Sequence, residues 1–372
     1  MFQRNNWAGE PINTAYTDQR IRNEPLVEIT QVKGTSETHQ VLSPTDEWAA
    51  FEVWKNNKSV FNEDGTITSV EGETEGSYVR DALGIGLELE ASNAGNPYKL
   101  GFIGASDGHD ASSPIEEDQY FGKLGIQDGT AIDRGSVPRV KGDPPPPAYS
   151  IKTLEWGASG LTGVWAESNT RSSLFSALRR KEVFATSGPR IRVRFFAGYE
   201  YPDTMAESPN ALELAYQNGV PMGGDLVQTD IVPRFFVWAA RDPSEAWLQR
   251  AQIVKGWLAD GESYEQVFDV ACSDGAKPDA TTHRCPDNGA SVNLDDCSYS
   301  VGQGAGVLGT LWQDPAFDPD QRAFYYLRVL QNPTCRWSTW DAIRAGVAPS
   351  SEVPALIQER AWSSPIWYTP AT

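Results

Sequence analysis

The sequence has no long apolar run and contains little histidine, methionine or cysteine. Among 372 residues there are three His, three Met and four Cys. No apolar run approaches the ~18 residues that a membrane-spanning helix needs, so we expect no membrane span. The opening residues MFQRNNWAGEP also lack the apolar stretch of a secretory signal.

Basic side chains are scarce relative to acidic ones. The sequence holds 31 Lys and Arg against 50 Asp and Glu, which gives a formal net charge of −19. A surface this acidic repels phosphate backbones, so we exclude nucleic acid as a partner and disfavour anionic membranes. The simplest consequence of the charge is solubility.

Apolar and aromatic residues are plentiful by contrast. They include 13 Trp, 13 Tyr and 14 Phe, and the hydrophobic fraction is 40%. This is ordinary globular composition, and it argues against disorder. The length suggests two domains, or one large domain with an appendage.

The N-terminal half alternates predicted strands and helices. PLVEITQVK (25–33) and YKLGFIGASD (98–107) are typical of strands, and apolar spacing predicts a helix over 78–92. Ser43 followed by Pro44 predicts another helix from about residue 44. The order predicts an α/β domain with a parallel sheet, which we place at residues 1–189.

The pattern changes near residue 190. A last helix, capped by Asn169 or Thr170 and ending near Lys181, leads into period-two strands such as PRFFVWAA and RAFYYLRVL. We therefore predict a β-rich, sandwich-like domain over residues 190–372.

All four cysteines lie in the last third of the chain, in loop-like sequence. Of the three possible pairings we favour Cys272–Cys285 and Cys297–Cys335, because each would close a surface excursion or tie it to a strand end. A zinc site that includes His283 is the alternative, but the spacing lacks a C-x-x-C pair. Disulfides imply an oxidising compartment.

A carboxylate and an imidazole stand at the end of a predicted strand in FIGASDGHD. Asp107 and His109 are two positions apart, so on a strand they project to the same face with Cα atoms ~7 Å apart. This pair is a standard ligand combination for zinc, manganese or iron. The alternative is a surface turn in which the aspartate caps the next segment.

A second cluster follows the earlier predicted strand. Glu28 lies on that strand, and Glu37 and His39 lie in the loop after it. In a parallel sheet both strand ends open onto one rim, so we predict one divalent-metal site from the two clusters. The alternatives are a salt-bridged Glu28, a helix-capping Glu37 and a solvent-facing His39.

Other catalytic patterns are weak. There is no G-x-S-x-G elbow, and Ser187 has no histidine near it in sequence, which disfavours a serine hydrolase. Lys33 and Arg190 could bind an anionic substrate beside a metal, although exposed basic residues more often have no catalytic role.

Several long blocks of the sequence carry a resemblance to a known family. They include EPLVEITQVKGTSETH, GFIGASDGHDA, GLTGVWAESNTRSSLFSALRRKEVFATSGPRIRVRFF, CPDNGASVNLDDC and DPAFDPDQRAFYYLRVLQNPTCRWSTWDA. Together they resemble the family known as domain of unknown function 3604, which is similar to the PHP (polymerase and histidinol phosphatase) superfamily of metal-dependent phosphoesterases. The resemblance implies a distorted β/α barrel with two or three metals, followed by a β-rich region. It places the closing D-x-H on Asp107 and His109, and Glu37 and His39 fall in a family block.

Family members look longer at the N-terminus and open with an H-x-H strand. We therefore expect this chain to be N-terminally truncated, with a partial barrel and an incomplete metal site. The expected function is a metal-dependent hydrolase, a phosphoesterase acting on a small phosphorylated molecule, in the periplasm or secreted. The alternatives are a non-catalytic secreted protein that binds carbohydrate or protein, and an inert fragment.

Overall fold

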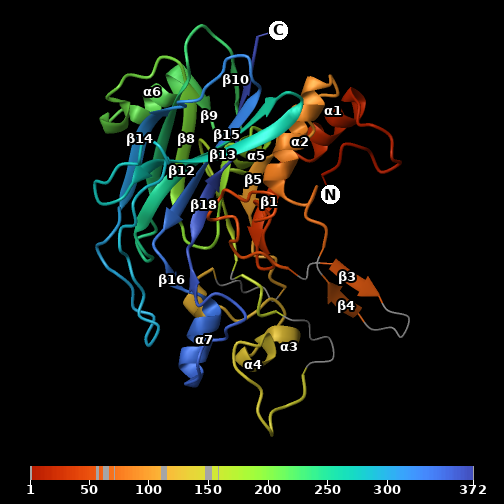
Figure 1. Ribbon diagram of the computed structural model, residues 1–372, viewed down its shortest axis with the longest axis vertical. Helices are drawn as coiled ribbons and strands as arrows, with labels where there is room; N and C mark the ends of the chain where they lie inside the picture. The colour runs from red at the N-terminus through yellow and green to blue at the C-terminus, as the bar shows by residue number, and fades with distance from the viewer. Residues whose placement is uncertain are drawn as a thin grey trace.

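The structure is a computed structural model that describes residues 2–55, 58–61, 67–70, 72–109, 115–146, 153–157 and 159–371. Over these residues the chain is a mixed α/β protein with seven α-helices and five sheets, most of them antiparallel (Figure 1). Strands outweigh helices, as expected for the C-terminal half.

A small sheet near the N-terminus holds the predicted parallel pair. Strands β1 (Leu26–Gln31) and β5 (Gly101–Gly104) run parallel, and β2 (Gly34–Thr35) returns antiparallel along β1. Helix α2 (Val79–Ala91) buries Leu83 and Leu87 in a cluster with Ile29 and Phe102 of these strands and with residues of the large sheet described below. Strand β1 and helix α2 lie where the sequence predicts them. Strand β5 lies within the predicted range 98–107 but ends at Gly104, so Asp107 and His109 belong to the loop after it and the expected projection from a strand is wrong.

The helix predicted from residue 44 is wrong, because residues 44–52 form turns. The Ser43 hydroxyl lies 2.6 Å from the Thr38 hydroxyl and does not cap a helix. Asp46 is buried, and its Oδ2 accepts a hydrogen bond from Arg80 Nη2 at 2.9 Å. Tertiary ion pairing therefore overrides the local capping signal.

Two larger sheets form most of the β structure. The four-stranded sheet contains β8 (Arg192–Gly198), β9 (Gly219–Pro221), β11 (Arg234–Ala240) and β14 (Val307–Gln313). The eight-stranded sheet contains β6 (Leu161–Val164), β7 (Val183–Thr186), β10 (Asp225–Val227), β12 (Leu248–Ala259), β13 (Glu262–Cys272), β15 (Ala323–Gln331), β18 (Arg360–Ser363) and β19 (Ile366–Thr369). This sheet takes strands from both sides of residue 190.

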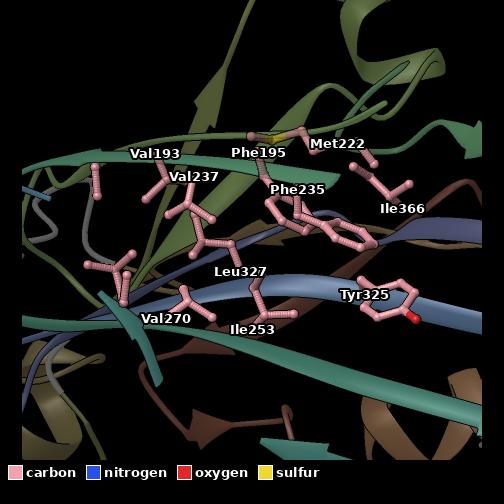
Figure 2. Packing of buried hydrophobic residues seen from close by; sticks show 14 of the residues in the cluster. Val193, Phe195, Met222, Phe235, Val237, Ile253, Val270, Tyr325, Leu327 and Ile366 are labelled. Atoms are coloured by element: carbon pink, nitrogen blue, oxygen red, sulfur yellow. The ribbon is translucent and has the colours of Figure 1, made fainter. Parts of the chain in front are cut away.

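The two large sheets pack face to face through one apolar core (Figure 2). Phe195 and Phe235 of the smaller sheet meet Ile253, Tyr325 and Leu327 of the larger one. Alternate residues on each strand point into this core, which accounts for the period-two pattern.

The remaining elements are short. Helix α5 begins where predicted, because Thr170 Oγ1 accepts a hydrogen bond from the Ser173 amide. The other elements are α1 (Thr14–Asn23), α3 (Gly125–Asp128), α4 (Ala131–Arg134), α5 (Arg171–Arg179), α6 (Ala211–Asn218), α7 (Trp337–Ala345) and the strand pairs β3 (Lys58–Phe61) with β4 (Ile67–Val70) and β16 (Thr334–Cys335) with β17 (Leu356–Ile357).

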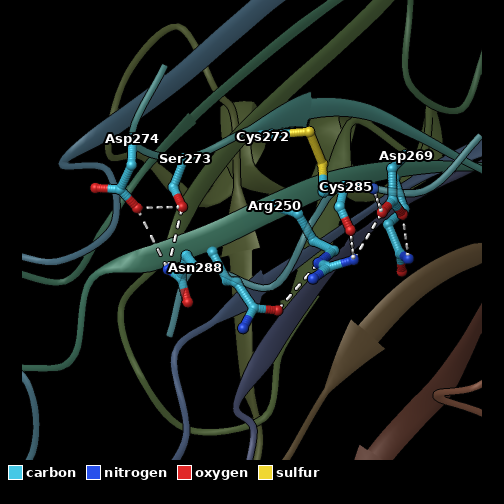
Figure 3. Close-up of a disulfide and its surroundings, with 9 residues drawn as sticks. Arg250, Asp269, Cys272, Ser273, Asp274, Cys285 and Asn288 are labelled. Atoms are coloured by element: carbon cyan, nitrogen blue, oxygen red, sulfur yellow. Dashed lines mark hydrogen bonds and ion pairs between the residues drawn. A yellow bond between two sulfur atoms is a disulfide. The ribbon is translucent and has the colours of Figure 1, made fainter. Parts of the chain in front are cut away.

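The favoured disulfides are confirmed. Cys272 pairs with Cys285 at the end of β13 (Figure 3), and Cys297 pairs with Cys335. Beside the first disulfide, the Cys285 amide donates to Oδ2 of the buried Asp269 at 2.6 Å, and Arg250 Nη1 lies 2.8 Å from the same oxygen, so the excursion is anchored on the large sheet.

The expected partial PHP-like barrel is not confirmed. Within the described ranges no sheet closes on itself, and the parallel pairing beside β1 is limited to β5. The same residues include no helix with the length and hydropathy of a membrane span.

Candidate functional site

The loops that follow the parallel strands β1 and β5 lie side by side. The Ala105 amide donates to the Thr30 carbonyl at 3.1 Å, and the Val32 amide donates to the Ser106 carbonyl at 3.2 Å. These bonds join the loop after β5 to the loop after β1, so Asp107 comes beside Lys33. Asp107 has a φ of 51°, a left-handed conformation that is uncommon for a residue other than glycine.

Four polar side chains meet at this strand end. Asp107 Oδ2 lies 2.7 Å from Lys33 Nζ, and the same oxygen accepts a hydrogen bond from Lys123 Nζ. Asp107 Oδ1 lies 3.3 Å from His109 Nε2. We call Lys33, Asp107, His109 and Lys123 the strand-end cluster.

Lys123 is placed by a tight loop before α3. The Asp128 carboxylate accepts hydrogen bonds from the amides of Lys123 and Leu124, the latter at 2.8 Å. The His109 amide donates to the Lys123 carbonyl at 2.9 Å. The Lys123 side chain is only 7% exposed, and its Nζ lies over the Trp156 ring, 5.8 Å from the ring centroid.

The cluster strongly favours the ionised carboxylate. Burial opposes ionisation of Asp107, but hydrogen bonds from Lys123 and Lys33 outweigh it and lower its pKa to about 2. Glu28, on β1, has the opposite shift, since burial and then the charge of Asp107 raise its pKa. Glu28 therefore belongs to the same electrostatic neighbourhood.

Glu37 lies in a different environment. Its buried Oε1 accepts hydrogen bonds from Arg80 at 2.6 Å, Tyr326 at 2.7 Å and Arg328 at 3.0 Å. Burial opposes its ionisation, but Arg328 and then Arg80 lower its pKa to about 2. This carboxylate neutralises arginines of α2 and β15.

His39 and Arg190 are also outside the strand-end cluster. The His39 Nδ1 accepts the Val41 amide at 3.2 Å, and the ring lines a hollow of about 210 Å³ together with Glu52 and Arg336. Arg190 is 66% exposed at the surface, with Nη1 3.5 Å from Glu116 Oε1.

Asp107 and His109 can supply two ligands of a divalent cation, and the remaining ligands must come from other groups. Asp107 and His109 offer a carboxylate and an imidazole in contact, the donor types that suit zinc, manganese or iron. Among the described residues, however, no three His, Cys, Asp or Glu side chains are grouped to hold a metal. Two of the five predicted ligands thus lie in direct contact, with Glu28 nearby.

Sequence reasoning missed Lys123. It lies in the irregular segment after residue 110, where no periodicity or motif marks it. Only the fold brings it to Asp107. Beside Lys33 there is also a polar hollow of about 240 Å³ that no sequence signal indicates.

Comparisons with known proteins give one match. Residues 1–370 match the family described as "Protein of unknown function (DUF3604)". No curated protein and no solved structure matches the chain. Any statement of activity therefore depends on the residues described above.

Proposed function

The chain belongs to the DUF3604 family, and from the strand-end cluster we propose that it is a metal-dependent hydrolase that cleaves a phosphate ester of a small molecule. The supporting observation is the contact between the Asp107 carboxylate and the His109 imidazole, flanked by two ammonium groups, where parallel strands end. Carboxyl ends of parallel strands are where such folds build sites.

Asp107 and His109 would hold the cation. The chemistry that a divalent cation supplies there is Lewis acidity toward a phosphoryl oxygen and a lowered pKa of water. The chain's own contribution is electrostatic, because Lys33 and Lys123 place two positive charges where negative charge develops on phosphorus oxygens. At 33% exposure, the Lys33 side chain remains accessible to a substrate.

A location outside the cytoplasm belongs to the same proposal. Two disulfides fix loops of the C-terminal half, and disulfides persist in oxidising compartments. We propose that the protein works in the periplasm or is secreted.

Metal binding and phosphate release test the function. The wild-type protein should bind zinc, manganese or iron, measured by elemental analysis after dialysis, and should release phosphate from p-nitrophenyl phosphate. Asp107→Asn and His109→Ala should each lower metal content and turnover by tenfold or more, whereas Asp203→Asn, at a 92% exposed side chain, should change neither. A wild-type protein that retains no metal and shows no metal-stimulated turnover contradicts the proposal.

A further inference from the structure

We infer that Lys33 and Lys123 bind the phosphate group of the substrate, and that the polar hollow beside Lys33 holds a small, hydroxyl-rich alcohol portion. This inference rests on the proposed function and adds the substrate class and a second lysine to it. Its basis is the juxtaposition of an unequal charge cluster and a polar hollow that share one side chain, Lys33.

The charge balance at Asp107 favours an added anion. One carboxylate oxygen serves two ammonium groups, each of which carries three donors and no acceptor. Two ammonium groups therefore share the one carboxylate of Asp107, and the exposed Glu28 is a further carboxylate in the neighbourhood. In a chain of net charge −19, two lysines converging on one carboxylate oxygen form a place suited to a dianion.

The two lysines have different roles in binding. The buried Lys123 is fixed through its backbone to Asp128, and its Nζ lies over the Trp156 ring, so binding need not order it. Lys33 follows β1 at the turn into β2 and is partly exposed. It is the group that can exchange Asp107 for an incoming phosphate.

The hollow that Lys33 lines is small and polar. Its 240 Å³ is below the usual range for drug-sized ligands, which indicates a small molecule. Besides Lys33 and Gly34 the lining comprises Gln31, Thr35, Ser36, Trp54, Ser77 and Tyr78. The hydroxyl and amide groups of this lining suit a polyol or sugar, whose apolar faces can contact the Trp54 and Tyr78 rings.

Asp107 acts as an internal competitor for the lysines. Replacing its carboxylate by an amide should free both ammonium groups for phosphate while it removes a metal ligand. The variant Asp107→Asn should therefore bind phosphate more tightly and metal more weakly, a pair of opposite effects that a merely structural role would not produce.

Calorimetric titration with inorganic phosphate in metal-free buffer tests the lysines. Lys33→Met and Lys123→Met should each weaken binding by about tenfold or more, since each removes a charge-assisted hydrogen bond. Lys277→Met removes the same charge from an exposed loop and should bind like wild type. Phosphate binding that is absent in wild type, unchanged in both lysine variants, or weaker in Asp107→Asn overturns the inference.

These outcomes separate the inference from the proposed function. Lysine-dependent phosphate binding without any metal binding contradicts the hydrolase and leaves the anion site. If the protein binds metal and turns over substrate but its phosphate affinity does not depend on either lysine, the hydrolase proposal stands and the anion site is wrong. Because Lys123 is buried, the melting temperature of each variant is measured first, and the more exposed Lys33 supplies the test if Lys123→Met does not fold.

The hollow is tested with esters and a blocking variant. Glycerol 1-phosphate and glucose 6-phosphate should bind more tightly than inorganic phosphate, and Ser77→Trp should remove that advantage while leaving inorganic phosphate unaffected. Ser36→Trp, on the same lining, serves as the second blocking variant. If phenyl phosphate gains as much as the polyol esters, or if both tryptophan variants bind all esters normally, the assignment of the hollow is wrong.

Discussion

Arg328 Nη2 donates to Asp46 Oδ1 at 2.8 Å, and both side chains are completely buried. A second bond joins Arg328 Nη1 to Asp46 Oδ2 at 2.9 Å, so the pair is bidentate. It connects the central strand β15 to the turns after β2, across 282 residues of sequence. The ion pair thus fixes the N-terminal sheet region against the large sheet.

Breaking this pair should destabilise the protein strongly. Arg328→Met leaves a buried carboxylate short of its partner, and such losses cost about 3–5 kcal/mol. The measurement is the free energy of unfolding in denaturant. Asp203→Asn, which breaks the exposed pair with Arg234, should cost less than about 1 kcal/mol. Equal effects of the two substitutions would contradict the role assigned to Arg328.

The same ion pair shows where sequence reasoning ends. Period-two and helical patterns predict β1, β5, α2, α5 and the β-rich half, because those patterns reflect local burial. Ser43 and Pro44 form an equally good local signal, yet arginines from α2 and β15 draw Asp46 into the core and prevent that helix. Long-range charge partners leave no mark in local spacing.

In the candidate site, too, residues close in sequence could be predicted to meet, whereas residues brought together by the fold could not. Asp107 and His109 are two positions apart in sequence and are found in contact, so their pairing was predictable. Lys123 reaches Asp107 through an irregular loop, and Glu37 is committed to distant arginines. Neither could be placed without the tertiary structure.

Stability should fall as pH rises from about 5 to 8, because of Glu117. Burial, and then the charge of Glu52, raises the pKa of the Glu117 carboxyl to about 8, and its Oε1 has no hydrogen-bond partner. The ordinary pKa is 4.5, so above pH 4.5 the folded state holds a proton that the unfolded chain has lost. This contribution is full below pH 4.5 and is lost as pH rises through the folded pKa.

Glu117→Gln mimics the protonated acid and should flatten the decline. Denaturant unfolding at pH 5 and pH 8 should show a smaller stability difference in the variant than in wild type. Glu359, whose pKa burial also raises, shares the sign, so some slope should remain. Asp107 and Glu37 have lowered pKa values and act only at more acidic pH. A variant with an unchanged slope would contradict this role of Glu117.

The two disulfides should stabilise the fold to different extents. Cys272 and Cys285 are 13 residues apart, and Cys297 and Cys335 are 38 apart. On a chain-entropy estimate the first closure contributes about 3 kcal/mol and the second about 4 kcal/mol. Paired serine substitutions, compared by denaturant unfolding, should show the larger loss for the second pair. Reversed order, or no loss from either, would contradict this prediction.

Gly34 sets the turn that carries Lys33, and its replacement should be costly for a specific reason. Gly34 has a φ of +112°, and an added Cβ would lie 2.2 Å from the Glu52 carbonyl oxygen. Gly142 has nearly the same φ, +110°, with no atom within 4 Å of an added Cβ. Gly34→Ala and Gly142→Ala therefore share the backbone strain and differ in the clash.

The alanine at position 34 should lower the free energy of unfolding by at least about 2 kcal/mol more than the alanine at position 142, because backbone cannot yield as a side chain does. It should also weaken phosphate binding, since the displaced turn moves Lys33 away from Lys123, the other proposed phosphate ligand. Unfolding in denaturant and calorimetric titration measure the two effects. If Gly34→Ala and Gly142→Ala destabilise the protein equally, the backbone conformation alone accounts for the cost of replacing Gly34. The close approach of β2 to residue 52 then does not position Lys33.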